Sequence, residues 1–240
     1  SVKNNMIGVQ ASGFVNIVGS KSKGGMLSGI ANIVGKYSDG VMVSGLMNIT
    51  SGYANGFQAS GFANIVGRES NGVGIAGLMN ISGKDMNGLH ISGLANVTGR
   101  DQKGVVISGL MNATSHKANG LQIASIINIA GKENRGLQLS ALSNVGVDVK
   151  GVQATALSNI AADTLRGFQI AGAVNIAVNS IKSFQIAGLA NISQGKTTGM
   201  QLAPANYAGN LDGIQVGLLN MCDINSQGVQ IGLINYSKDS

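Results

Sequence analysis

Apolar and outward-facing positions alternate over short segments of this chain, and each segment is bounded by glycine or another small residue. Residues 88–103, GLHISGLANVTGRDQK, are typical, because Leu89, His90 and Ile91 alternate, a corner of small residues follows, and a second apolar run comes next. Alternation with a period of two, bounded by glycine, predicts short β-strands and not helices. About sixteen residues leave room for two or three such strands with their turns.

The alternation also predicts which side chains point inward. The aliphatic residues of each unit are expected to stack inward on their equivalents one unit earlier; in this segment they are Leu89, Ile91, Leu94 and Val97. The column between them, where His90 stands, is expected to face solvent. It becomes a regular glutamine column in the second half: Gln138, Gln153, Gln169, Gln185, Gln201, Gln215 and Gln230.

Asparagine recurs at a fixed interval from end to end. Its positions are Asn16, Asn32, Asn48, Asn64, Asn80, Asn96, Asn112, Asn128 and Asn144, each 16 residues from the last, and then Asn159, Asn175, Asn191, Asn206, Asn220 and Asn235. Helical and leucine-rich repeats need longer units. The period therefore predicts an all-β fold, a parallel β-solenoid of about fifteen coils, as a single repeat domain over residues 1–240 whose coils shorten to 14–15 residues toward the C-terminus.

The asparagine row has a structural interpretation. In stacked parallel strands, each side-chain amide can hydrogen-bond to its copies above and below. The row is therefore predicted to be a structural ladder and not a binding row. Asn-Gly pairs such as Asn87-Gly88 predict tight turns, because glycine tolerates a positive φ.

A resemblance supports this interpretation. The segments GLHISGLANVTG, GLQIASIINIAG and GFQIAGAVNIAV resemble the Gly-φ-Gln-φ-(Ser/Ala)-Gly-Leu-x-Asn units of an uncharacterised bacterial surface-repeat family found in secreted or lipid-anchored proteins. The resemblance runs from about Gly8 to Asn235. It implies an extracytoplasmic location, at the cell surface or secreted, and it does not imply an activity. The first residues, SVKNNMIGV, provide no leader for such a location.

Charge gathers in the polar segment between coils. A basic column is expected at Lys36, Arg68, Lys84, Arg100, His116 and Lys132, and an acidic column beside it at Glu69, Asp85, Asp101 and Glu133. Neighbouring columns of opposite sign can neutralise each other on a solvated edge. The net charge of +6 and pI of about 9.6 also allow the basic column to bind an acidic glycan or a surface protein. Nucleic acid is a less favoured partner, because aromatic residues make up only 4% of the chain.

The other functional classes have less support. No catalytic residue, cofactor or metal site is predicted, and the single cysteine, Cys222, stands many coils from either histidine. The alternative to a non-enzymatic adhesive repeat protein is a carbohydrate-active hydrolase or lyase, since Asp85 and Asp101 would stack at the ~5 Å separation of a retaining glycosidase. No cluster of Tyr or Trp is expected as a sugar platform. No apolar run is long enough for a membrane-spanning helix, and self-association is expected at the coil ends or along the side.

Overall fold

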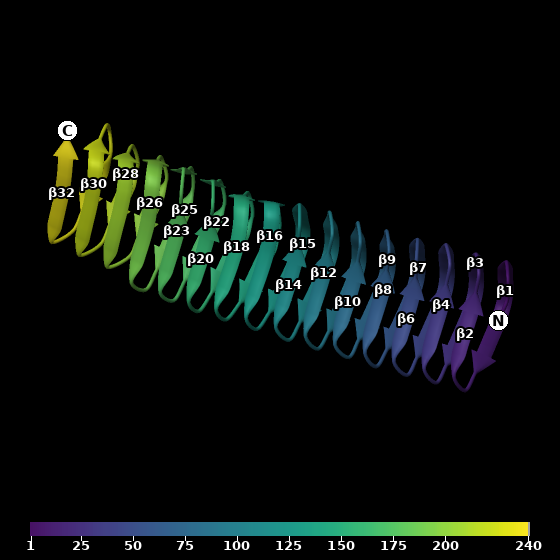
Figure 1. Ribbon diagram of the computed structural model, residues 1–240. Helices are drawn as coiled ribbons and strands as arrows, with labels where there is room; N and C mark the ends of the chain where they lie inside the picture. Colours follow the sequence, from purple (N-terminus) through teal and green to yellow (C-terminus); the bar gives the residue numbers. More distant parts are fainter. Residues whose placement is uncertain (240) are drawn as a thin grey trace. The chain divides into compact units, whose positions relative to one another are not determined.

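The chain is a parallel β-solenoid of about fifteen turns with a repeat of about 16 residues, as the sequence predicts (Figure 1). The structure is a computed structural model and describes residues 1–239. It divides into two compact units, residues 1–120 (unit 1) and residues 121–240 (unit 2). Every described strand pairing is parallel, and each strand pairs with its copy in the next coil. The backbone hydrogen bonds of one coil are therefore satisfied by its neighbours within each unit.

A coil of unit 1 consists of one long and one short strand. The strands are β1 (Asn5–Ser12), β2 (Val15–Val18), β3 (Lys21–Ser28), β4 (Ala31–Val34), β5 (Tyr37–Ser44), β6 (Met47–Thr50), β7 (Tyr53–Ser60), β8 (Ala63–Val66), β9 (Ser70–Ala76), β10 (Met79–Ser82), β11 (Met86–Ser92), β12 (Ala95–Thr98), β13 (Gln102–Ser108) and β14 (Met111–Thr114), followed by β15 (Lys117–Ala124). The long strands bend at a glycine of positive φ, such as Gly88 at 108°. This position favours glycine. The positive φ agrees with the prediction from Asn87-Gly88, but the pair lies within β11 and not in a tight turn.

In unit 2 the strand that carries the inner glutamine is short, and in several coils the strand that carries the ladder asparagine is the long one. The strands are β16 (Ile127–Asn134), β17 (Leu137–Ser140), β18 (Ser143–Val149), β19 (Val152–Thr155), β20 (Ser158–Ala161), β21 (Thr164–Leu165), β22 (Phe168–Ala171), β23 (Val174–Ala177), β24 (Ser180–Ile181), β25 (Phe184–Ala187), β26 (Ala190–Thr197), β27 (Met200–Leu202), β28 (Ala205–Leu211), β29 (Ile214–Val216), β30 (Leu219–Asn225), β31 (Val229–Ile231) and β32 (Ile234–Asp239). The register offset falls from 16 residues between β22 and β25 to 14 between β27 and β29, where Met200 pairs with Ile214.

The asparagine ladder is present in both units. In unit 1 the Nδ2 of Asn80 donates to the Oδ1 of Asn96 at 2.9 Å, and in unit 2 the Nδ2 of Asn175 donates to the Oδ1 of Asn191 at 3.0 Å. The same Nδ2 of Asn80 also donates to the carbonyl oxygen of Ile91 at 2.9 Å, at the end of the next coil's long strand. Asparagine suits this position because one short side chain supplies two N–H donors and an acceptor. The ladder thus joins neighbouring coils and fixes the corner between strands.

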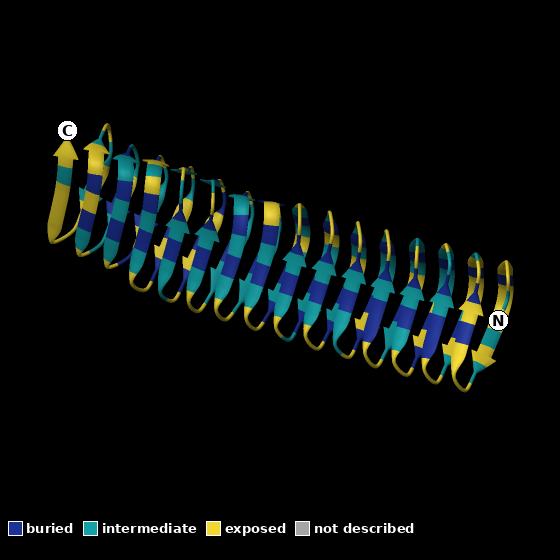
Figure 2. Cartoon of the chain, in the orientation of Figure 1, coloured by how far each residue is buried: buried dark blue, intermediate teal, exposed yellow. Residues whose placement is uncertain are grey.

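The predicted inside and outside of the coil are reversed. His90 is buried, with 1% of its surface exposed, and the glutamines of unit 2 from Gln138 to Gln215 are fully buried. Leu94 is 39% exposed, and Leu89, Ile91 and Val97 are only partly buried. The expectation of inward aliphatic columns and a solvated glutamine column is therefore wrong. Figure 2 shows buried and less buried residues alternating along the strands.

The interior is narrow and contains small or amide-bearing side chains. In one coil of unit 1 the buried positions of β11 and β12 are Met86, His90, Ser92, Asn96 and Thr98. Unit 2 builds a second ladder inside, in which the Nε2 of each glutamine donates to the Oε1 of the one before, as from Gln185 to Gln169 at 2.8 Å. Buried amides of this kind are stable only when their donors and acceptors are paired. Many large aliphatic side chains are therefore left on the outside, although Leu165, Ile181 and Leu211 are fully buried in unit 2.

Close approach between coils explains the glycine at the corner. A Cβ added to Gly93 would lie 2.1 Å from the carbonyl oxygen of Gly77 in the coil before. No side chain fits there without moving the backbone. The Ser-Gly corner of the repeat is thus a steric requirement of stacking.

Candidate ligand-binding site

The predicted basic column forms on one edge of unit 1. The backbone N–H of Lys84 donates to the carbonyl of Arg68 at 2.8 Å, and the same bond repeats from Arg100 to Lys84 and from His116 to Arg100 at 2.9 Å. These four residues therefore follow one another, one per coil. Lys36 lies in the same column, two coils before Arg68. Lys132, the remaining predicted member, is an exposed residue of β16 in unit 2.

The acidic column lies beside the basic column, and some of its carboxylates already bond to other residues of the chain. Asp85 forms an ion pair with Arg100, whose Nε lies 2.8 Å from Oδ1, and the same oxygen accepts the backbone N–H of Asp101 at 3.2 Å. The hydrogen bond from Arg100 is the main reason that the pKa of Asp85 lies below its usual value. Asp101 in turn accepts the backbone N–H of Lys117 at 3.2 Å. These acids neutralise part of the basic column and bond to the backbone of the next coil.

Glu133 in unit 2 is held in the same way. Its Oε1 lies 2.7 Å from the Nε of Arg135 and 2.5 Å from the Nζ of Lys150. The hydrogen bond from Arg135 comes first among the causes that lower the pKa of Glu133 to about 2. The carboxylate is therefore ionised at neutral pH and already paired.

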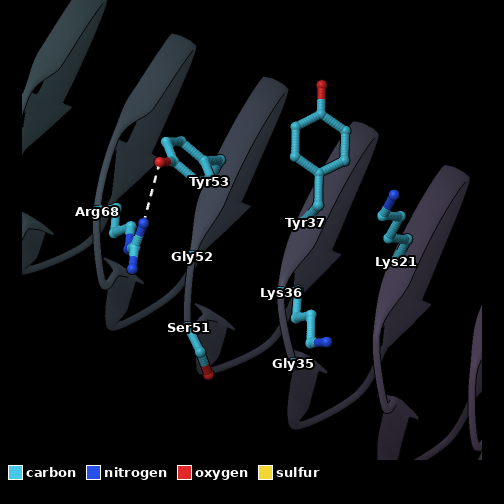
Figure 3. Close-up of a pocket in the computed structure, with 8 residues that line it drawn as sticks. All are labelled: Lys21, Gly35, Lys36, Tyr37, Ser51, Gly52, Tyr53 and Arg68. Atoms are coloured by element: carbon cyan, nitrogen blue, oxygen red, sulfur yellow. Dashed lines mark hydrogen bonds between the residues drawn. The ribbon is translucent and has the colours of Figure 1, made fainter.

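A cleft of about 600 Å³ opens on the N-terminal part of this edge in unit 1 (Figure 3). Its charged and aromatic lining comes from Lys21, Lys36, Tyr37, Tyr53 and Arg68. None of the lining residues is a carboxylate. In the cleft Arg68 contacts Tyr53, whereas Arg100, two coils farther along the edge, contacts Asp85 at the equivalent position.

The two tyrosines of the cleft are in register and anchored. Tyr37 and Tyr53 are paired positions of β5 and β7. The Nδ2 of Asn55 donates to the hydroxyl of Tyr37, and the Nη1 of Arg68 donates to the hydroxyl of Tyr53 at 3.1 Å. The guanidinium carbon of Arg68 lies 5.6 Å from the centroid of the Tyr53 ring, within the range of a cation–π contact. The cleft therefore offers aromatic rings next to cations.

This pair of tyrosines corrects the expectation that no tyrosine cluster exists. The sequence holds four tyrosines, and two of them stand 16 residues apart, directly after the positions of Lys36 and Gly52 in the basic column. Their spacing equals the repeat length and was the signal that could have placed them side by side. Lys21 occupies the same position of the repeat one coil before Tyr37. It was not predicted, although the same 16-residue spacing could have placed it there.

Other chemical groups do not converge. Within residues 1–239 no three His, Cys, Asp or Glu side chains lie together as a metal site would require. Cys222 is buried, and its sulfur accepts a contact from the Nε2 of Gln230 at 3.6 Å. Among the described residues no helix is long and apolar enough to cross a membrane.

Comparison of the chain with protein-family models, with curated proteins and with solved structures finds no match. The chemistry of the basic and aromatic cleft is therefore the main guide to what this protein binds.

Proposed function

We propose that the chain is a non-enzymatic structural and adhesive repeat protein, at the cell surface or secreted, and that it binds an acidic glycan. The observation that carries the proposal is the cleft of unit 1, where Lys21, Lys36 and Arg68 surround Tyr37 and Tyr53 with no carboxylate in the lining. Cations attract carboxylate or sulfate groups, and aromatic rings provide flat apolar surfaces for sugar rings. The location rests on the sequence resemblance to the surface-repeat family.

The carboxylates give the enzymatic alternative less support. A glycosidase needs one carboxyl group whose pKa is raised so that it can act as an acid. The pKa of Asp85 is shifted in the opposite direction by Arg100, and one of its oxygens accepts a backbone N–H. The Asp85 and Asp101 pair therefore fits a role in coil stacking better than one in catalysis.

The proposal is tested by measuring binding to a panel of neutral and acidic glycans at low and high salt. The parent chain should bind acidic glycans and lose them at high salt. The double variant Lys36→Gln/Arg68→Gln should bind about tenfold more weakly, as expected for two exposed charge contacts. The charge-matched variant Lys23→Gln/Lys103→Gln changes two exposed lysines outside the cleft lining and should bind as the parent does.

Variants of Tyr53 separate the contribution of ring stacking to the affinity from the contribution of charge. Tyr53→Phe keeps the ring and should retain most of the affinity, whereas Tyr53→Ala should lose it. The glycan proposal would be overturned if the parent chain bound no glycan on the panel, or if the two charge variants lost equal affinity.

A further inference from the structure

A second surface lies on unit 2, and it is apolar. The outward side chains of β22, β25, β27 and β29 include six large hydrophobic residues that are 38–46% exposed: Phe168, Ile170, Phe184, Ile186, Leu202 and Ile214. We refer to these six residues as the apolar face. The strand register places Phe168 beside Phe184 and Ile170 beside Ile186. Leu202 continues the second column, and Met200 lies between Phe184 and Ile214 in the first.

No charge interrupts the apolar face. The sequences of its strands, FQIA, FQIA, MQL and IQV, contain no ionisable residue, and their glutamines point into the core. The rings of Phe168 and Phe184 stack with centroids 5.3 Å apart and planes 6° apart. At roughly 80 Å² for each half-exposed side chain, the six residues present on the order of 500 Å², the size of the largest functional patches on soluble proteins.

Cations border the part of this face that contains the two phenylalanines, whereas Asp212 stands at the equivalent position before Ile214. Arg166 and Lys182 each stand two residues before a phenylalanine of the face, and both are exposed. Their backbone N–H groups bond to the preceding coil in the same way, from Arg166 to Val149 at 2.7 Å and from Lys182 to Leu165 at 2.8 Å. Arg166 and Lys182 therefore occupy the same position in successive coils. Among the ion pairs of the described residues, neither Arg166 nor Lys182 takes part.

The acids nearby are already engaged. Asp163 accepts a hydrogen bond from the Nδ2 of Asn179, and Asp212 forms an ion pair with Lys196 at 2.9 Å. A second copy of the apolar face would cover the hydrophobic columns, but of these two acids it would bring only Asp163 outside an ion pair, one carboxylate for the two cations Arg166 and Lys182. A surface that is both apolar and anionic would match both features.

We propose that unit 2 docks on an anionic lipid surface through the apolar face, with Arg166 and Lys182 contacting the headgroups. Phenylalanine and isoleucine side chains would enter the boundary between headgroups and acyl chains, as the apolar faces of interfacial helices do. Lysine and arginine near an anionic leaflet each strengthen binding about fivefold. This docking uses residues distant in sequence from the cleft of unit 1 and does not depend on glycan binding.

A tryptophan reporter tests the proposal directly, because the chain contains no tryptophan. The variant Phe184→Trp places one fluorophore on the face, and Phe57→Trp places one at the equivalent outward position of unit 1. The probes are vesicles of phosphatidylcholine, alone or with about one third phosphatidylglycerol. Emission of the reporter at position 184 should shift to the blue with the anionic vesicles only, and emission at position 57 should not shift.

Flotation of the unmodified chain with the same vesicles gives a second measurement that needs no variant. In the Phe184→Trp background, Arg166→Gln/Lys182→Gln should weaken binding about 30-fold, while the charge-matched Lys23→Gln/Lys103→Gln should leave it unchanged. No flotation with anionic vesicles, equal binding to neutral vesicles, or equal losses in the two charge variants would overturn the proposal. A blue shift that grows with protein concentration in the absence of vesicles would overturn it in favour of a second copy.

Discussion

The interiors of the two units differ at one position of the coil and agree at another. Both contain the asparagine ladder. The second inner column is a glutamine ladder in unit 2, whereas in unit 1 it changes from coil to coil and includes Met26, Met42, Gln58, Gly74, His90 and Val106. The ladder position is thus asparagine in every coil, and the neighbouring column contains several kinds of side chain.

The mixed column of unit 1 leaves polar atoms with poorer partners. The Nε2 of Gln58 contacts the sulfur of Met42 at 3.7 Å, and the Oε1 of Gln58 has no hydrogen-bond partner among the described residues. The amide oxygen of Gln10, in the same column, also has no hydrogen-bond partner among the described residues. In unit 2 the Oε1 of Gln169 accepts from Gln185 at 2.8 Å. A ladder is therefore stabilising, because the N–H group of each amide donates to the oxygen of the neighbouring amide.

Removing one member of the asparagine ladder should have the largest effect, and a similar one in both units. Asn80→Ala in unit 1 and Asn175→Ala in unit 2 each delete four side-chain hydrogen bonds and leave groups above and below without partners. We expect the free energy of unfolding to fall by about 4 kcal/mol in each case. Urea denaturation measures this. Asn179→Ala removes an exposed asparagine of unit 2 and should cost less than about 0.5 kcal/mol.

Acid should weaken unit 1 through His90. Burial lowers the pKa of His90 to about 4, so that the folded protein holds it neutral while the unfolded chain takes up a proton near pH 6.5. Stability is therefore intact above pH 6.5 and falls as the pH drops toward 4, by up to about 3 kcal/mol.

The measurement is the denaturation midpoint as a function of pH in variants of the two histidines. His90→Gln introduces the residue that this column carries in other coils, and it should remove the loss between pH 6.5 and 4. His116→Gln changes an exposed histidine and should keep the loss. Identical pH profiles for the parent and His90→Gln would contradict the assignment.

The fold followed from the sequence because the 16-residue period is a direct consequence of stacking. The phase of the alternation was assigned wrongly, although the sequence contained the information. In the segment 95–98, ANVT, neighbouring residues face opposite sides of the strand. If Asn96 belongs to a buried ladder, Val97 must point outward and Thr98 inward, as the structure shows. In this fold the local constraint outweighs the general preference of aliphatic residues for the core.

The candidate site was predictable only in part. The basic column could be predicted, because charged residues recur at one position of the repeat. The cleft could not, because its tyrosines occupy the column that carries acids in later coils, and only two coils contain them. The anchoring of Tyr37 by Asn55 depends on where side chains turn, which the repeat pattern does not specify.

A reciprocal exchange tests the contrast between the two inner columns and should give the smallest effects. Gln169→Met in unit 2 keeps the volume but leaves the Nε2 of Gln185 without its acceptor, and we expect a loss of about 2 kcal/mol. Met42→Gln in unit 1 should be neutral or stabilising by up to about 1 kcal/mol, because an amide oxygen replaces the sulfur that faces Gln58 and Ser38. Urea denaturation of both variants decides the point. Equal losses would mean that packing volume, and not amide pairing, distinguishes the two interiors.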